Sequence, residues 1–188
     1  MIAGLDEAGR GPLAGPVVAA AVILPRRCSL PGLTDSKLLP RLERERLYRE
    51  ILKRAVGVGI GEASSAEIDR VNVLEATRLA MVRALAGLHP PADCLLLDAL
   101  TLPSVSLPQR AIVKGDRLVS SIAAASIVAK VTRDRLMAGV FEAEFPGYGF
   151  ASHKGYGTAA HLAALKEHGP CDIHRSSFRP VREALFQR

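Results

Sequence analysis

At 188 residues, with 48% hydrophobic and 23% charged positions, the chain has the composition of one folded globular domain, which excludes a long disordered or fibrous protein. The longest apolar run, residues 17–24, is too short to span a bilayer, and no basic-then-apolar leader precedes it, so we expect a cytoplasmic protein without a membrane segment. The net charge of +6 favours an anionic partner, of which nucleic acid is the commonest; a basic protein with no such partner is the alternative.

Apolar runs and strict alternation predict five short strands. They cover residues 2–6, 16–24, 56–64, 93–98 and 110–113. The first two are joined by the glycine-rich stretch "EAGRGPLAG" and predict an antiparallel hairpin. The three cysteines are far apart and form no C-x-x-C pair, which argues against a disulfide framework or a cysteine zinc site.

Helical spacing and end signals predict five helical segments. They cover residues 41–55, 67–70, 73–88, 118–141 and 158–167. Pro40 suits the start of the first segment, and Ser65 is expected to cap the second. The run "SSIAAASIVAK" is small and apolar, so this helix can pack closely on a sheet. No repeat or linker divides the chain, and we predict one α/β domain with a mixed central sheet flanked by helices.

Four acidic residues stand at the ends of predicted elements in apolar surroundings. They are Asp6, Glu7, Asp98 and Asp116. An ionised Asp98 after "LLL" is costly unless a cation meets it. Oxygen ligands select hard cations such as Mg²⁺ or Mn²⁺. For any one acid, a solvated charge or a helix cap is the competing interpretation, above all for Asp116, but four acids at element ends favour a metal site.

The stretch that follows the first two acids is rich in glycine. Adjacent residues of a regular strand point to opposite faces, so Asp6 and Glu7 share a site only if the chain bends there, and Gly9 and Gly11 would allow a bend. The glycines match neither a dinucleotide fingerprint nor a phosphate loop. A tight hairpin turn is one interpretation; bare backbone that approaches a ligand, with Arg10 offering charge to a phosphate, is the other.

Seven blocks of the sequence carry a family resemblance. They are "GLDEAGRGPLAGPVVAAAVIL", "DSK", "LLLDAL", "KGD", "SSIAAASIVAKVTRD", "HKGYGT" and "HRSSF". In this order, and over residues 2–181, they resemble ribonuclease HII, the type 2 ribonuclease H family. The resemblance implies a ribonuclease H-like fold and an endonuclease that cuts the RNA strand of RNA–DNA hybrids. It also implies incision 5′ of single ribonucleotides embedded in duplex DNA, giving 3′-hydroxyl and 5′-phosphate ends.

The carboxylates of the family fall on the same four acids, Asp6, Glu7, Asp98 and Asp116. Asp134 is a rival for the fourth position, but Asp116 matches the acid of the "KGD" block. Asp134 lies about five helical turns further along and is expected to pair with Lys130 or Arg133. The resemblance implies two Mg²⁺ or Mn²⁺ ions about 4 Å apart, which support in-line attack of water and departure of the 3′ oxygen.

The resemblance also implies how substrate is bound. The backbone of Gly9, Arg10 and Gly11 would detect the 2′-hydroxyl that distinguishes RNA from DNA. Tyr156 would stack on the sugar at the RNA–DNA junction, whereas Tyr48 and Tyr148 fit core positions. We expect residues 142–188 to form a small helical C-terminal extension that helps bind substrate, and the protein to be a monomer.

Further candidates for phosphate contacts are basic or hydroxylic. They are Lys37, Lys114, Lys154, Ser121 and Arg175. A solvated side chain is the alternative for each basic residue, and a helix cap is the alternative for Ser120 and Ser121. The histidines match no zinc pattern, so we leave them out of the metal site.

Two other functions compete with this interpretation. Ribonuclease HIII shares the fold but carries an additional N-terminal substrate-binding domain; since only five residues precede Asp6, we expect the type 2 enzyme. A catalytically silent nucleic-acid-binding protein would keep the scaffold, but the presence of all four carboxylates disfavours it.

Overall fold

A five-stranded sheet in the order β3-β2-β1-β4-β5 forms the centre of the protein. The computed structural model describes residues 1–186. The strands are β1 (Ile2–Ala8), β2 (Val17–Ile23), β3 (Gly57–Ala63), β4 (Cys94–Asp98) and β5 (Gln109–Ile112). β1, β2 and β3 pair antiparallel, whereas β4 runs parallel to both β1 and β5. The predicted hairpin and mixed sheet are therefore confirmed.

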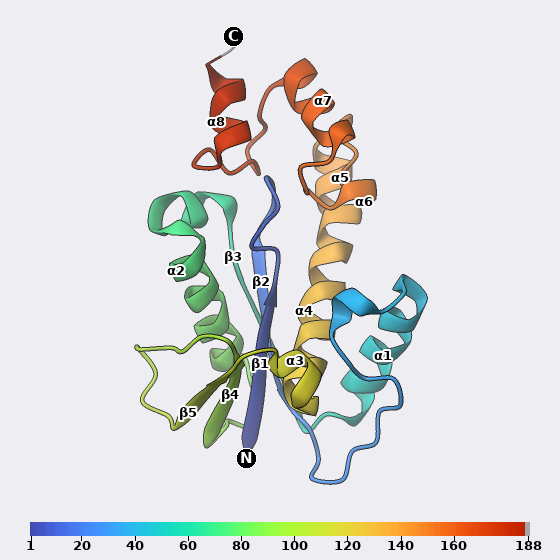
Figure 1. Cartoon of the computed structure of the whole chain (residues 1–188), viewed down its shortest axis with the longest axis vertical. Helices are drawn as coiled ribbons and strands as arrows, with labels where there is room; N and C mark the ends of the chain where they lie inside the picture. The colour runs from blue at the N-terminus through green and yellow to red at the C-terminus, as the bar shows by residue number, and fades with distance from the viewer. Residues whose placement is uncertain (187–188) are drawn as a thin grey trace.

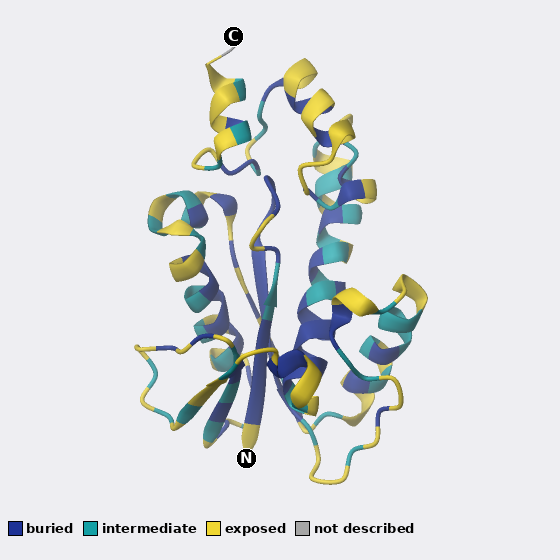
Figure 2. Cartoon of the chain, in the orientation of Figure 1, coloured by how far each residue is buried: buried dark blue, intermediate teal, exposed yellow. Residues whose placement is uncertain are grey.

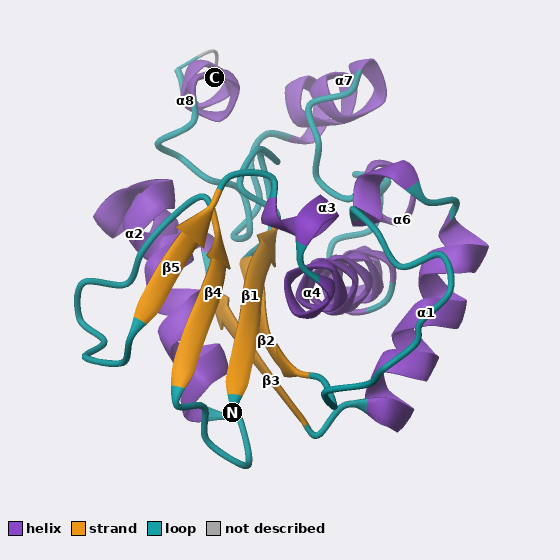
Figure 3. Ribbon diagram, turned by 60° about the horizontal axis from the view of Figure 1, so that its bottom comes forward, coloured by secondary structure: helices purple, strands orange, loops and turns teal. Residues whose placement is uncertain are grey.

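Helices cover both faces of this sheet (Figure 1). α2 (Ser65–Ala86) lies on one face and α4 (Ser120–Ala138) on the other, with α1 (Arg41–Arg54) packed on the outer side of α4 (Figure 3). The shorter elements are η1 (Ser36–Leu38), α3 (Gly115–Leu118), α5 (Val140–Glu144), α6 (Phe150–His153), α7 (Ala159–His168) and α8 (Arg179–Leu185). α6, α7 and α8 gather beyond the end of the sheet that carries the β1–β2 loop. They form the expected helical C-terminal part, whose residues 187–188 lie outside the described chain.

Three helix boundaries differ from the sequence expectation. The helix expected over 118–141 is three helices, because Val119 is extended (φ −130°, ψ 117°) and Gly139 leaves the helical region. Asn72 interrupts α2 with a φ of 70°, so the two segments predicted separately are its two halves. The cap of α2 is Ser64 and not Ser65: the Ser64 hydroxyl accepts from the Glu67 amide, and the Glu67 carboxylate accepts from the Ser64 amide.

Alternate residues of the strands feed two hydrophobic cores, and the central strands between them are buried along most of their length (Figure 2). Leu5 and Ala21 pack in the core shared with α2, whereas Ala20 and Val22 pack in the core shared with α1 and α4. Gly4 faces α4 so closely that a Cβ there would lie 2.2 Å from the main chain of Ser121. Since strand side chains alternate, the side chain of Asp6, two residues after Gly4, also faces α4.

None of the helices in residues 1–186 combines the length and apolar character needed to span a bilayer. Within the same residues the three cysteines are free thiols.

Candidate active site

Three aspartates meet at the carboxyl ends of β1 and β4. Leu5 pairs with Leu97 across these parallel strands, so the residues that follow, Asp6 and Asp98, lie side by side. The connection after β5 passes over the ends of these strands to the short helix α3 (Figure 3), which brings Asp116 to them. One carboxylate oxygen from each aspartate lies within 4.8 Å of the other two. The structure thus brings together three of the four predicted carboxylates.

The cluster carries more negative charge than its surroundings neutralise. Burial, and then the neighbouring Glu7 carboxylate, raises the pKa of Asp6 well above its usual range. Burial also raises the pKa of Asp116, with nearby aspartates adding to the shift. Asp98 accepts a hydrogen bond of 2.8 Å from the Gly115 amide, which ties β4 to α3. A site made of crowded carboxylate oxygens has the donor set that a hard divalent cation prefers.

Glu7 lies beside the cluster and not within it. β1 continues in register through Ala8, and the turn begins only at Gly9, whose φ is 99°. β1 therefore shows no bend between Asp6 and Glu7, yet the Glu7 carboxylate still lies close enough to raise the pKa of Asp6. Glu7 Oε1 lies 3.4 Å from an Arg10 nitrogen, while Oε2 is buried without a hydrogen-bond partner among residues 1–186. Burial raises the pKa of Glu7, and a cation nearby would relieve this orphaned oxygen.

Two fully buried arginines hold the loop that follows. Arg175 donates to the carbonyl oxygens of Gly9 (2.6 Å), Arg10 (2.9 Å) and Gly15. Arg133, on α4, donates to the carbonyls of three further residues, Ala14, Pro16 and Lys154. A Cβ on Gly9 would lie 2.1 Å from Arg133 Nε, so the loop closes over this side chain only with glycine at that position.

Arg175 corrects one expectation. It was predicted to contact phosphate, but its guanidinium is enclosed and its donors are used by main-chain carbonyls. Burial lowers the pKa of Arg175 to about 9, and the neighbouring Arg133 adds to that effect. The sequence gives no signal that separates these two arginines from the exposed ones, because both stand among polar residues near helix ends or loops.

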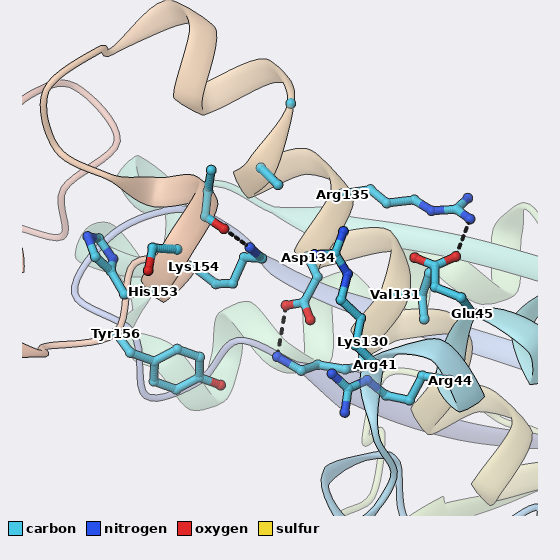
Figure 4. A pocket seen from close by; sticks show the side chains of 14 residues that line it. Arg41, Arg44, Glu45, Lys130, Val131, Asp134, Arg135, His153, Lys154 and Tyr156 are labelled. Carbon is cyan, nitrogen blue, oxygen red and sulfur yellow. Dashed lines mark hydrogen bonds and ion pairs between the residues drawn. The ribbon is translucent and has the colours of Figure 1, made fainter.

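Tyr156 lies between two basic hollows. A groove of about 690 Å³ between α1, α4 and α6 is shown in Figure 4. Its basic residues are Arg41, Arg44, Lys130, Arg135 and Lys154. A smaller hollow, of about 350 Å³, is lined by Glu7, residues 9–11 and Lys37, and shares Arg44, Lys130 and Tyr156 with the groove. The Tyr156 side chain is exposed, with Lys130 Nζ 5.6 Å from its ring centroid.

The remaining predicted residues lie in different places. Lys37 and Lys114 are exposed. Lys154 is half-buried, which lowers its pKa, and its ammonium donates to the carbonyl of Ala151. Ser121 lines another hollow with Met1 and Ile2, so it is not brought to the pocket of Tyr156. Neither Ser120 nor Ser121 caps α4, because the residue at its N-cap position is Val119.

Asp134 pairs with Lys130 at 2.8 Å, as expected for a residue outside the carboxylate cluster. Tyr148 is buried, as expected for a core residue.

The "DSK" block supplies residues that sequence reasoning did not place. Asp35 is buried and accepts from the Lys37 amide (2.9 Å) and from Arg117 (3.1 Å). The Ser36 hydroxyl lies 2.9 Å from that of Ser126, and a hydrogen bond from Ser126 partly offsets the raised pKa of Asp6. A polar triplet that ends a proline- and glycine-rich loop was the available signal.

The fold and this cluster together define a metal-dependent nuclease of the ribonuclease H type. The structure of ribonuclease H2 from Pyrococcus horikoshii OT3 matches with a TM-score of 0.79 at 26% identity, over 99% of this chain and 97% of that one. The family model described as ribonuclease HII matches residues 3–181.

Curated relatives agree with that family. Ribonuclease HII of Desulfitobacterium hafniense (strain DSM 10664 / DCB-2) is 57% identical over 184 residues, covering 98% of this chain and 70% of the relative. Ribonuclease HII of Syntrophotalea carbinolica is 58% identical, covering 98% and 88%. The chain therefore belongs to the ribonuclease HII family and is a type 2 ribonuclease H, a nuclease that acts on RNA–DNA hybrids.

Proposed function

We propose that this nuclease also incises duplex DNA on the 5′ side of single embedded ribonucleotides, leaving 3′-hydroxyl and 5′-phosphate ends. The observation that carries the proposal is the position of Tyr156. Its exposed ring borders both the hollow of the 9–11 loop and the basic groove, so one residue adjoins the backbone that would read RNA and the surface that would hold DNA.

Asp6, Asp98 and Asp116 would hold Mg²⁺ or Mn²⁺, with Glu7 as the fourth carboxylate. Their crowded oxygens and the orphaned Glu7 Oε2 support this assignment. Two such ions, when bound, supply an activated water for in-line attack and a Lewis acid for the departing 3′ oxygen. Gly115, by donating to Asp98, keeps that carboxylate turned toward the cluster.

The 9–11 loop would recognise the ribonucleotide through its main chain. Arg175 binds the Gly9 and Arg10 carbonyls from the protein interior, while Arg10 and Gly11 are exposed. A backbone fixed in this way has little freedom to lose when it hydrogen-bonds the 2′-hydroxyl, the group that marks RNA.

The phosphate contacts would come from Lys37, Lys114 and Lys154. The exposure of the first two and the place of Lys154 in the groove support this role. A monomer is supported by a carboxylate cluster built within one chain. The free thiols support a reducing compartment such as the cytoplasm.

Cleavage of a duplex that contains one ribonucleotide, in Mg²⁺ and in Mn²⁺, tests the proposal. We expect a single incision 5′ of the ribonucleotide and none in the all-DNA duplex. Tyr156→Ala should slow this reaction more than it slows cleavage of a long RNA–DNA hybrid. Tyr156→Phe, which keeps the ring, should leave the relative rates on the two substrates as in wild type. Binding without incision would favour a silent binding protein and sink the proposal.

A further inference from the structure

A group of buried histidines lies directly behind Tyr156. His153, His161 and His174 come from α6, α7 and the segment before α8, and all three are buried. The rings of His153 and His161 stack with centroids 4.4 Å apart. His161 and His174 face each other with 3.0 Å between their Nε2 atoms. The carboxylate chemistry makes no use of these side chains, so their arrangement needs another explanation.

The two ends of the His161–His174 pair fix where each hydrogen sits. His161 Nδ1 lies 2.9 Å from the carbonyl oxygen of Tyr156, which only accepts, so Nδ1 carries the hydrogen. His174 Nδ1 lies 2.9 Å from the Cys171 amide, which only donates, and 3.1 Å from the Cys171 sulfur, whose S–H can also donate to it, so this nitrogen is bare. A neutral imidazole has one N–H, so His174 Nε2–H donates to His161 Nε2. The hydrogen bonds therefore run in one direction, from Cys171 to Tyr156.

This direction requires both rings to be neutral. A proton added to His174 would place Nδ1–H against the Cys171 amide, and a proton added to His161 would place two N–H groups face to face. Burial lowers the pKa of His174 to about 4 and lowers that of His161 as well. After burial, the largest cause that lowers the pKa of His174 is the neighbouring His161. No carboxylate is among the causes of either pKa shift. The chain of hydrogen bonds from Cys171 through the two histidines to Tyr156, here called the relay, is therefore intact at neutral pH.

The Tyr156 main chain takes up the end of this relay. Its carbonyl accepts from His161 and from the Thr158 amide, and its amide donates to the carbonyl of His153. His153 is itself fixed, because its Nδ1 accepts from the Gly155 amide and its Nε2–H donates to the Tyr148 carbonyl. The exposed ring of Tyr156 thus rests on a main chain whose position is set from within.

We propose that His161 and His174 are positioning residues that fix Tyr156 and thereby set the preference of the enzyme for single embedded ribonucleotides over long hybrids. They act through Tyr156 and do not touch substrate. This inference rests on the proposed role of Tyr156, so its test must separate the two.

The decisive quantity is the ratio of kcat/KM for a single-ribonucleotide duplex to kcat/KM for a long hybrid, because a change in the folded fraction alters both values equally. His161→Leu removes the hydrogen bond to the Tyr156 carbonyl and should lower the ratio about two- to tenfold. His161→Asn, whose amide can donate from the position of Nδ1, should restore most of it. His174→Leu should act like His161→Leu, and His174→Gln, which keeps a donor at Nε2, should be milder. His89→Leu, an exposed histidine before Pro90, is the matched control and should leave the ratio unchanged.

Combining variants shows whether the histidines act through Tyr156. In a Tyr156→Ala background, His161→Leu should cause no further loss in the ratio. An additional loss there, or an unchanged ratio in His161→Leu when Tyr156→Ala alone lowers it, would overturn the inference and leave the role of Tyr156 standing. Equal losses on both substrates in Tyr156→Ala would instead overturn the proposed role of Tyr156 and this inference with it.

A spectroscopic test needs no substrate. In ¹⁵N-labelled protein at neutral pH, the ring nitrogens should show His161 protonated at Nδ1 and His174 protonated at Nε2. The opposite tautomer in either ring, or an imidazolium signal from either at pH 6, would contradict the relay.

Discussion

The carboxylate cluster leaves polar groups crowded or without a hydrogen-bond partner, whereas the loop beside it pairs the polar groups that it buries. At the cluster, Asp6, Asp98 and Asp116 crowd their oxygens together, and Glu7 keeps a buried oxygen that no described residue satisfies. At the 9–16 loop, each of the two buried guanidiniums directs all of its nitrogens to main-chain carbonyl oxygens.

The difference fits the roles proposed above, with cutting at the cluster and recognition of RNA at the loop. Crowded carboxylates cost stability, because like charges repel and burial disfavours the charged form; the cost is relieved when a cation binds. The loop, by contrast, is already held by hydrogen bonds from Arg175 before substrate arrives, which lowers the cost of ordering it on binding. A substitution at the cluster should therefore lower activity without lowering stability, whereas a substitution that removes a guanidinium from the loop should lower stability.

The largest expected effect is on activity. Asp98→Asn should reduce cleavage of an RNA–DNA hybrid by more than about a hundredfold, the most that loss of a group behind a metal ligand usually costs. The free energy of unfolding should stay the same or rise, because one repelling charge is gone. Cleavage rates and denaturant unfolding would measure the two. Asp134→Asn is the control, and near-normal turnover in Asp98→Asn would remove Asp98 from the metal site.

The reverse pattern is expected at the loop. Arg175→Met leaves the carbonyls of Gly9, Arg10 and Gly15 without their charged donor and should lower the free energy of unfolding by about 3–5 kcal/mol. Arg179→Met, on an exposed residue paired with Glu183, should change it by less than about 0.5 kcal/mol. Denaturant titration compares the two variants. If Arg175→Met were as stable as Arg179→Met, the loop would not depend on the guanidinium.

The histidine pair should make stability depend on pH. The pKa of His174 falls from its usual 6.5 to about 4 in the folded protein, so between these values the unfolded chain binds a proton that the folded one does not. The contribution of His174 to the free energy of unfolding is fully present above pH 6.5. It declines as pH falls toward 4, by up to about 3 kcal/mol. Unfolding of wild type and His174→Gln between pH 7 and 4 tests this. An equally steep decline in both would assign the dependence to other groups.

The smallest effect separates Glu7 from the aspartates. Mn²⁺ should stabilise the protein by about 3 kcal/mol at a concentration one hundred times its dissociation constant. The shift should vanish in Asp98→Asn and persist in Asp134→Asn. In Glu7→Gln a reduced shift would support Glu7 as the fourth ligand, and a full shift would place it outside the metal site. Thermal unfolding with and without Mn²⁺ provides the measurement.

The sequence predicted the aspartates well because their positions follow from the fold. Asp6 lies near the end of β1 and Asp98 ends β4, and the parallel pairing of these apolar strands brings the two residues together. The sheet, its hairpin and the helices on both faces were likewise predictable from periodicity. The relation of Glu7 to the cluster was not, because it depends on whether one peptide departs from strand geometry, and β1 remains regular there.

Long-range polar contacts were also beyond the sequence. Arg175 resembles any basic residue in a phosphate-binding protein until the structure shows it buried against residues 160 positions away. The histidines match no ligand spacing, and nothing in their spacing indicated that two of them face each other. Such roles arise from packing between segments, which local patterns do not encode.

The contact between Arg175 and Arg10 spans 165 residues of sequence. During synthesis, the loop next to the first carboxylates leaves the ribosome early, but the guanidinium that completes its hydrogen bonds is added only when almost all of these 188 residues have been translated. A partly made chain that ends before residue 175 lacks the hydrogen bonds that this guanidinium donates to the loop. The order of translation therefore leaves this loop, which we propose reads RNA, without its buried guanidinium until residue 175 has been added.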